Sequence, residues 1–153
     1  NLKSDYLFKG SLKPNNAVCA IITYKDKILI QQRDYKKNIF FPGHYGLFGG
    51  AIEKNETKIN ALKRELKEEI GIEINKKNIK YLTNMILDFK IIGYEQYKRT
   101  VYLVRLNYNQ LKKLKLGEGS KMVWENKKKI YFKNKLIPYD AFAIWLYLFK
   151  KTK

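Results

Sequence analysis

Residues 50–72 have the sequence GAIEKNETKINALKRELKEEIGI, and this stretch decides the fold. Its apolar side chains recur at steps of three and four residues, the spacing of one stripe along an α-helix: Ile59, Leu62, Leu66 and Ile70. Thr57 can accept a hydrogen bond from the first turn, and Gly71 can adopt the left-handed conformation that ends a helix. We therefore predict an amphipathic helix over residues 57–70, with one apolar face toward a core.

Acidic residues are concentrated in the same stretch. Five of the nine glutamates of the chain fall between positions 53 and 69: Glu53, Glu56, Glu65, Glu68 and Glu69. On the helix, Glu65, Glu68 and Glu69 share an arc of about 100°, where like charges repel by a few tenths of a kcal/mol per pair. A bound hard cation such as Mg²⁺ would offset this repulsion, because it prefers carboxylate oxygens. The alternative is a solvated acidic face, paired with basic residues of the same helix.

The other elements are predicted from apolar and β-branched runs. Strands are expected over residues 17–24, 27–33, 47–50, 81–89 and 99–106, with an edge piece near 122–124. A loop covers residues 34–45, a short helix falls within 107–116, and Pro138 opens a last helix through residue 149. This order predicts an α/β fold in which a mixed β-sheet is covered by helices on both faces.

The spacing of the polar residues resembles that of the Nudix hydrolases. The pattern is Gly50, five residues, Glu56, seven residues, Arg64-Glu65-Leu66, one residue, Glu68-Glu69, one residue, Gly71-Ile72. No position departs from the family signature, and so many fixed identities at fixed spacing seldom arise by chance. The resemblance implies a single Nudix domain over residues 1–153 with a Nudix-like α/β/α sandwich.

The resemblance also implies an activity: hydrolysis of a nucleoside diphosphate linked to another group, by attack of water on phosphorus with Mg²⁺ or Mn²⁺. The implied metal ligands are three carboxylates and one main-chain carbonyl: Glu65, Glu68, Glu69, and Gly49 or Gly50. Arg64 and Glu56 would form a buried ion pair that orients these acids. Nucleoside triphosphates, nucleotide sugars and ADP-ribose all share the bond in question, so the sequence leaves the substrate open.

A carboxylate must take the proton of the attacking water. Glu68 is the first candidate for this base. Some family members draw the base from a loop outside the signature, and here Glu118, between two glycines, could fold back over the site. Glu95 and Glu125 are weaker candidates. The alternative for Glu118 is an ordinary acid in a turn.

Substrate-binding residues are sought next to the signature. Arg33 ends the second predicted strand, where a similar residue in the family often reaches the substrate phosphates; a salt bridge at the sheet edge is the alternative. Phe41 and Tyr45 could stack on a base or sugar, or form the small core of their own loop. His44 lies between them and is more often a hydrogen-bonded structural residue than a ligand.

The net charge of +18 comes from 32 basic and 14 acidic residues and attracts polyanions of several kinds. Twenty-eight of the basic residues are lysines spread along the whole chain. Because specific base recognition favours the planar fork of arginine, this excess does not favour sequence-specific nucleic-acid binding. A solvated lysine surface explains most of the charge. The second function class is a non-catalytic Nudix-like module that binds RNA or protein.

Cys19 is the only cysteine, which excludes an internal disulfide and a cysteine-cluster metal site. No apolar run approaches the about 20 residues of a membrane span, and no charged-then-apolar leader opens the chain. We therefore expect a cytoplasmic protein that acts on a small nucleotide and has no membrane partner. The family resemblance allows a homodimer.

Overall fold

The structure is a computed structural model and describes residues 15–36 and 39–150. Seven strands follow the chain: β1 (Ala17–Tyr24), β2 (Lys27–Gln32), β3 (Tyr45–Gly46), β4 (Phe48–Ala51), β5 (Ile79–Asp88), β6 (Gln96–Arg105) and β7 (Lys121–Asn126). The α-helices are α1 (Lys58–Ile70), α2 (Tyr108–Lys113) and α3 (Pro138–Lys150). Short 3₁₀ turns lie at Lys76–Asn78, Lys90–Ile92 and Ile130–Phe132.

All seven strands belong to one sheet. Its main path is β3-β2-β1-β6-β5, with β4 paired to β1 and β7 paired to β2. β6 runs parallel to β1, from Ala17 opposite Arg99 to Thr23 opposite Arg105, and the other pairings are antiparallel. The sheet is therefore mixed, which confirms the predicted fold class.

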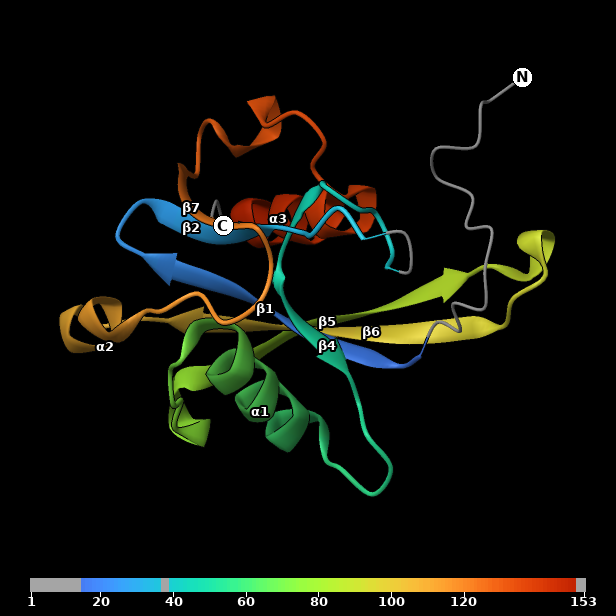
Figure 1. The fold of residues 1–153 in the computed structure, drawn as a ribbon, viewed down its shortest axis with the longest axis horizontal. Coiled ribbons are helices and arrows are strands. Elements are labelled where there is room, and N and C mark those ends of the chain that lie inside the picture. Colours follow the sequence, from blue (N-terminus) through green and yellow to red (C-terminus); the bar gives the residue numbers. More distant parts are fainter. Residues whose placement is uncertain (1–14, 37–38, 151–153) are drawn as a thin grey trace.

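The two long helices cover opposite faces of the sheet (Figure 1). Alternation along β1 supplies both cores, because successive side chains of a strand point to opposite faces. Val18 and Ile22 pack in the core beneath α1, together with Leu62 and Leu66 of that helix. Cys19 packs in the core beneath α3. The predicted α/β/α layering is confirmed.

Several boundaries differ from the predictions. β2 ends at Gln32, so Arg33 lies just beyond the strand. β3 was missed because two residues carry no periodic pattern, and it forms by pairing with β2. β7 is longer than the predicted edge piece, because it pairs with β2 over its whole length.

Parts of two predictions lie outside the described residues. These are residues 37–38 of the predicted loop and residues 1–14 and 151–153 of the predicted domain. Across the part of the chain that the structure describes, no helix has the length and apolar character needed to span a membrane.

Both ends of α1 are capped as predicted. The Thr57 hydroxyl accepts a hydrogen bond from the backbone N–H of Asn60 at 3.2 Å. Gly71 adopts a left-handed conformation with φ 69°, and its N–H donates to the Lys67 carbonyl at 3.0 Å. These caps fix where the helix begins and ends, and therefore where its acidic residues stand relative to the sheet.

We expect Thr57→Ala to lower the free energy of unfolding by about 1 kcal/mol, because one N–H of the first turn loses its acceptor. Thr57→Ser keeps the hydroxyl and should retain most of the stability. Urea denaturation of the three proteins measures the difference. Equal losses in both variants would contradict a capping role.

Candidate active site

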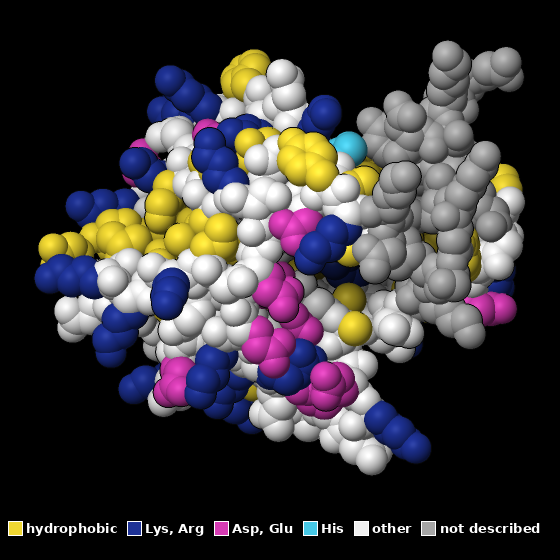
Figure 2. All heavy atoms as spheres, in the orientation of Figure 1, with side chains coloured by type: hydrophobic (Ala, Val, Ile, Leu, Met, Phe, Trp, Pro, Cys, Tyr) yellow, Lys and Arg dark blue, Asp and Glu magenta, His cyan; other side chains and the backbone are white. Residues whose placement is uncertain are grey.

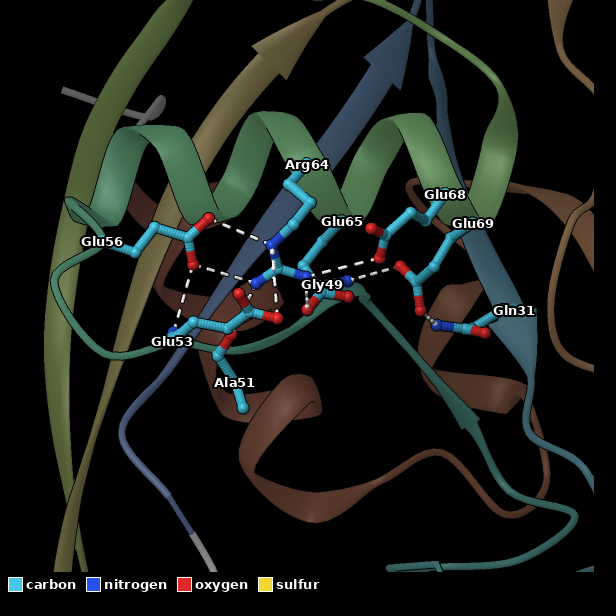
Figure 3. A network of polar contacts seen from close by, with 9 residues as sticks. All are labelled: Gln31, Gly49, Ala51, Glu53, Glu56, Arg64, Glu65, Glu68 and Glu69. Atoms are coloured by element: carbon cyan, nitrogen blue, oxygen red, sulfur yellow. Dashed lines mark hydrogen bonds and ion pairs between the residues drawn. The ribbon is translucent and has the colours of Figure 1, made fainter.

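Arg64 projects from α1 toward the segment that precedes the helix (Figure 3). Its Nε and Nη2 each donate to one carboxylate oxygen of Glu56 at 3.0 Å, and Nη2 also donates to the Ala51 carbonyl at 3.0 Å. Glu56 accepts a further hydrogen bond from the backbone of Glu53 at 3.1 Å. This bidentate pair ties the segment between β4 and α1 to the helix. The resemblance implied a buried ion pair; with 25% of Arg64 and 15% of Glu56 exposed, the pair is only partly buried.

Arg64 also contacts two of the clustered acids. Its Nη1 donates to Glu65 at 2.8 Å and to Glu68 at 3.3 Å. The guanidinium holds the pKa of Glu56 below its usual value, and Glu56 in turn raises the pKa of Arg64. The sequence left open that the acids pair with basic residues of their own helix, and Arg64 makes such pairs with Glu65 and Glu68.

Glu69 is the buried member of the cluster, with 7% of its surface exposed. One carboxylate oxygen accepts from the backbone N–H of Gly49 at 2.7 Å, and the other accepts from the Gln31 amide at 3.0 Å (Figure 3). Burial raises the pKa of Glu69 to about 7, although both hydrogen bonds act to lower it. Burial also raises the pKa of Glu65, against the effect of Arg64. Burial therefore disfavours the charged forms of both carboxylates.

Gly50 gives Glu65 its place. A Cβ on Gly50 would lie 2.5 Å from the Glu65 carboxylate, so a side chain here would displace that carboxylate.

Carboxylate and peptide oxygens are the ligands that Mg²⁺ and Mn²⁺ prefer, so the chemistry of the clustered glutamates and the nearby glycine carbonyls fits these ions. Among residues 15–36 and 39–150, no three carboxylate, imidazole or thiol groups lie close enough together to form a complete cation site. Arg64 holds an oxygen of both Glu65 and Glu68 in this arrangement.

A cavity of about 490 Å³ opens beside these acids. Its polar lining includes Gln31, Arg33, Gly49, Gly50, Glu65, Glu69, Arg99 and Glu118. Its apolar and aromatic lining includes Ile39, Phe40, Leu87, Phe89, Tyr97 and Tyr139. Figure 2 shows acidic side chains gathered near the centre of this face, while Lys and Arg are scattered around it. The cavity thus combines charged groups with flat apolar walls, as small-molecule sites do.

The loop after α2 folds back onto the end of α1. The Gly117 N–H donates to the Glu69 carbonyl at 2.8 Å, and a Cβ on Gly117 would collide with the carbonyl of Glu68. This contact brings Glu118 into the cavity wall, close enough to Glu65 to raise its pKa. The two weaker candidates lie elsewhere: Glu95 is exposed, and Glu125 pairs with Lys133.

Arg33 lines the cavity, and its Nε is buried without a hydrogen-bond partner among the described residues. The alternative of a salt bridge at the sheet edge is not found within the same part of the chain. The position of Arg33 therefore suits an anionic group of a ligand.

The other predicted substrate-binding residues lie outside the cavity lining. Phe41 contacts His44 and Tyr139 edge to face, with ring centroids 5.5 Å and 5.6 Å away. His44 Nδ1 lies 3.0 Å from the carbonyl of Pro42, and the Tyr45 ring lies 4.3 Å beneath the Lys133 ammonium. Of the partners of Phe41 and Tyr45, only His44 belongs to the same loop, whereas Tyr139 lies in α3 and Lys133 follows the 3₁₀ turn at Ile130–Phe132. Neighbouring residues 39 and 40 of the same loop reach the cavity instead.

Gln31 is a site residue that the sequence analysis missed. It is a buried polar residue on β2, two positions from Leu29, whose side chain packs in the core beneath α1. The period of two along a strand places Gln31 on that same face, toward the acidic helix. Its place on the same strand face as Leu29, and also as Arg33, was the signal that could have revealed it.

With this geometry established, comparison with known proteins identifies the family. The family model of the NUDIX domain matches residues 13–133. The chain belongs to the NUDIX family. The stretch 50–72 that holds Arg64 and the clustered acids lies within the matched NUDIX region.

Two curated NUDIX-region relatives illustrate the similarity. The 8-oxo-dGTP diphosphatase of Buchnera aphidicola subsp. Acyrthosiphon pisum (strain APS) is 47% identical over 55 residues, 35% of this chain and 40% of the relative. The CTP pyrophosphohydrolase of Escherichia coli (strain K12) is 40% identical over 62 residues, 40% of this chain and 44% of the relative. The chain thus spans less than half the length of these relatives.

Solved structures confirm the NUDIX fold over nearly the whole chain. The MutT NUDIX hydrolase from Burkholderia pseudomallei has a TM-score of 0.72 at 22% identity, covering 88% of this chain and 98% of its own. The MutT protein from Methanosarcina mazei Go1 has a TM-score of 0.74 at 21% identity, covering 94% of this chain and 100% of its own.

Glu56→Gln tests the ion pair with Arg64. The pKa of Glu56 is lowered in the folded protein, so its ionised form adds to the free energy of unfolding. This contribution is complete above the ordinary pKa of 4.5 and is lost as the pH falls through the lowered pKa. We expect the melting temperature of the wild type to exceed that of Glu56→Gln by a constant amount near neutral pH and by less in acid.

Thermal melts between about pH 3 and pH 7 measure this difference. Glu95→Gln, at an exposed position, serves as the control and should show no such trend. A gap between wild type and Glu56→Gln that does not change with pH would contradict the assignment.

Proposed function

We propose that the chain hydrolyses a pyrophosphate bond in a nucleoside diphosphate linked to another moiety, by attack of water on phosphorus. Nucleoside triphosphates, nucleotide sugars and ADP-ribose are the candidate substrates. The observation that carries this proposal is the convergence of Glu65, Glu69 and Arg33 on one cavity. Membership of the NUDIX family supports it, as do the names of the relatives, which describe diphosphatases and pyrophosphohydrolases.

The proposal includes a divalent metal, Mg²⁺ or Mn²⁺. The residues that would hold it are Glu65, Glu68, Glu69 and a main-chain carbonyl at Gly49 or Gly50. When bound, such an ion neutralises charge on the phosphate oxygens and lowers the pKa of water. The raised pKa values of Glu65 and Glu69 support this part of the proposal, because both carboxylates lie where an added positive charge would stabilise their ionised forms.

The remaining work falls to the residues of the chain. Arg64 orients Glu65 and Glu68 through hydrogen bonds and is itself fixed by Glu56. Arg33 is placed to donate to a substrate phosphate oxygen. These positioned groups are what phosphoryl transfer requires, since the reaction depends on orientation and charge rather than on covalent help from the protein.

Two carboxylates compete for the role of general base. Glu68 has a half-exposed side chain and a single long contact to Arg64, so it is free to turn toward a water. Glu118 lies in the cavity wall on a glycine-flanked loop. We propose Glu68 as the base and assign Glu118 a secondary role at the rim of the cavity.

Glu69→Gln should abolish hydrolysis while preserving the fold, because glutamine keeps an acceptor for the Gly49 N–H but loses the charge. We expect kcat/KM to fall by about a hundredfold or more. Release of phosphate-containing products from GTP, CTP, UDP-glucose and ADP-ribose, with Mg²⁺ and Mn²⁺, measures this.

Glu73→Gln provides the matched control, because Glu73 is an exposed glutamate that pairs with Lys67 outside the cavity. Turnover retained by Glu69→Gln would contradict the metal-site assignment. If the wild type released no product from any of the four compounds, the proposed hydrolysis would be contradicted and a non-catalytic binding module would be supported.

Glu68→Gln should lower kcat by about a hundredfold, as expected for loss of a general base. Glu118→Gln should lower kcat by less than about tenfold. Steady-state kinetics of the two variants distinguish them. A larger loss of kcat in Glu118→Gln than in Glu68→Gln would assign the general base to Glu118 instead.

A further inference from the structure

One member of a buried ion pair lines the same cavity, and the pair takes no part in the proposed hydrolysis. Arg99, from β6, and Tyr139, from the first turn of α3, belong to the lining. Arg99 Nη2 donates to Asp140 Oδ1 at 2.9 Å. The Asp140 side chain is 1% exposed, whereas 14% of Arg99 remains accessible. The pair therefore has a closed side at Asp140 and an open side at Arg99.

The Arg99 guanidinium is held rigidly in this position. Asp140 Oδ2 accepts a hydrogen bond from the backbone N–H of Leu47 at 2.9 Å, which anchors the carboxylate. The guanidinium carbon lies 4.8 Å from the centre of the Tyr139 ring, and Phe41 supports that ring from its edge. A group fixed in this way binds a ligand with little loss of side-chain entropy.

Arg99 also has an unused donor. In the part of the chain that the structure describes, two buried side-chain polar atoms lack a hydrogen-bond partner, and they are Nε of Arg33 and Nε of Arg99. Both arginines line this one cavity, although the whole chain has only four. Because an unpartnered buried donor is costly, each of these positions suits a ligand acceptor.

The two arginines differ in charge compensation. Arg33 has no ion pair among the described residues, which suits it to a phosphate. The charge of Arg99 is neutralised by Asp140, so Arg99 offers donors without a net charge. A neutral group with acceptor atoms is therefore the better partner for Arg99.

Flat apolar residues lie next to Arg99. Leu87 and Tyr97 face each other across β5 and β6, two residues along from the pair of Met85 and Arg99. Leu87 and Tyr97 line the cavity, and β5 and β6 extend beyond the end of α3 in Figure 1. Such a surface suits a planar ring, which stacks on aromatic and apolar side chains.

We propose that Arg99 determines base specificity, by selecting a nucleotide whose base presents two adjacent hydrogen-bond acceptors on one edge. This inference rests on the proposed function, because it concerns the nucleotide in the same cavity. Guanine has such an edge at O6 and N7, and arginine recognises that pair elsewhere with two hydrogen bonds. Cytosine has one at O2 and N3. Adenine and uracil alternate donors with acceptors along their edges and lack it.

Binding of nucleoside monophosphates to the full chain, measured by calorimetry without metal, tests this separately from turnover. We expect GMP, CMP or both to bind the wild type at least about tenfold more tightly than AMP and UMP. Arg99→Lys should remove this preference while changing AMP and UMP binding by less than about twofold. The GMP and CMP titrations show which acceptor edge is used.

Arg99→Lys keeps a cation beside Asp140, which protects folding. Should it fail to fold, the double variant Arg99→Met with Asp140→Asn removes both charges and keeps an acceptor for the Leu47 N–H. Arg105→Lys is the matched control, because Arg105 lies exposed on the same strand. Circular dichroism melts confirm that each variant is folded.

Equal binding of the four monophosphates by the wild type would overturn the proposal. So would a preference that persists in the folded Arg99 variants. A preference for GMP or CMP that is lost with Arg99 supports it even if no nucleotide is turned over, a result that would contradict the proposed hydrolysis alone.

Discussion

The carboxylate of Glu69 is the contact on which the cavity depends. It accepts hydrogen bonds from β4 and from β2, so one side chain joins the acidic helix to two strands of the sheet. The carbonyl of the same residue accepts from Gly117, which attaches the loop that carries Glu118. Removing the side chain would therefore break the links to β4 and β2 together, whereas the backbone link to Gly117 would remain. The same residue is buried and acidic, so the side chain that joins these elements also has a pKa raised by burial.

The net charge of the chain and the charges that line the cavity act on a ligand at different distances. The whole chain carries +18, which draws anionic ligands from a distance, because the field of many lysines adds up. Within the cavity, Glu65 and Glu69 oppose the close approach of a bare phosphate, while Arg33 favours it. A phosphate compound that arrives with a divalent cation satisfies both groups. The long-range and short-range fields thus favour the same kind of ligand.

Much of the fold could be predicted from the sequence, because the information was local. The apolar spacing of α1, the cap at Thr57 and the stop at Gly71 each depend on a few neighbouring residues, and all three are confirmed. The place of Arg64 beside Glu56 followed from the family signature. β3 and the full length of β7 could not be predicted, because each forms by pairing with β2 rather than from a pattern of its own.

The ligand side of the site was less predictable for the same reason. Phe41 and Tyr45 looked like cavity residues because they stand near the signature in sequence, yet Phe41 packs against His44 and Tyr139, and Tyr45 packs against Lys133. Arg99 and Tyr139 carry no local signal of function. Their meeting depends on a strand and a helix that the chain supplies long after the acidic helix. Sequence proximity was therefore a poor guide to which aromatic residues face the cavity.

The parallel pairing of β1 with β6 has a consequence for how the chain folds. Between these two strands the chain contains β2, β3, β4, α1 and β5, so β1 can complete the central sheet only after a distant segment has formed. Closing so long a loop costs entropy before any contact rewards it, which slows folding. A growing chain on the ribosome that does not yet include Tyr139 would lack one wall of the cavity. The wall of the cavity to which Tyr139 belongs is thus complete only after the chain has been made at least as far as this residue.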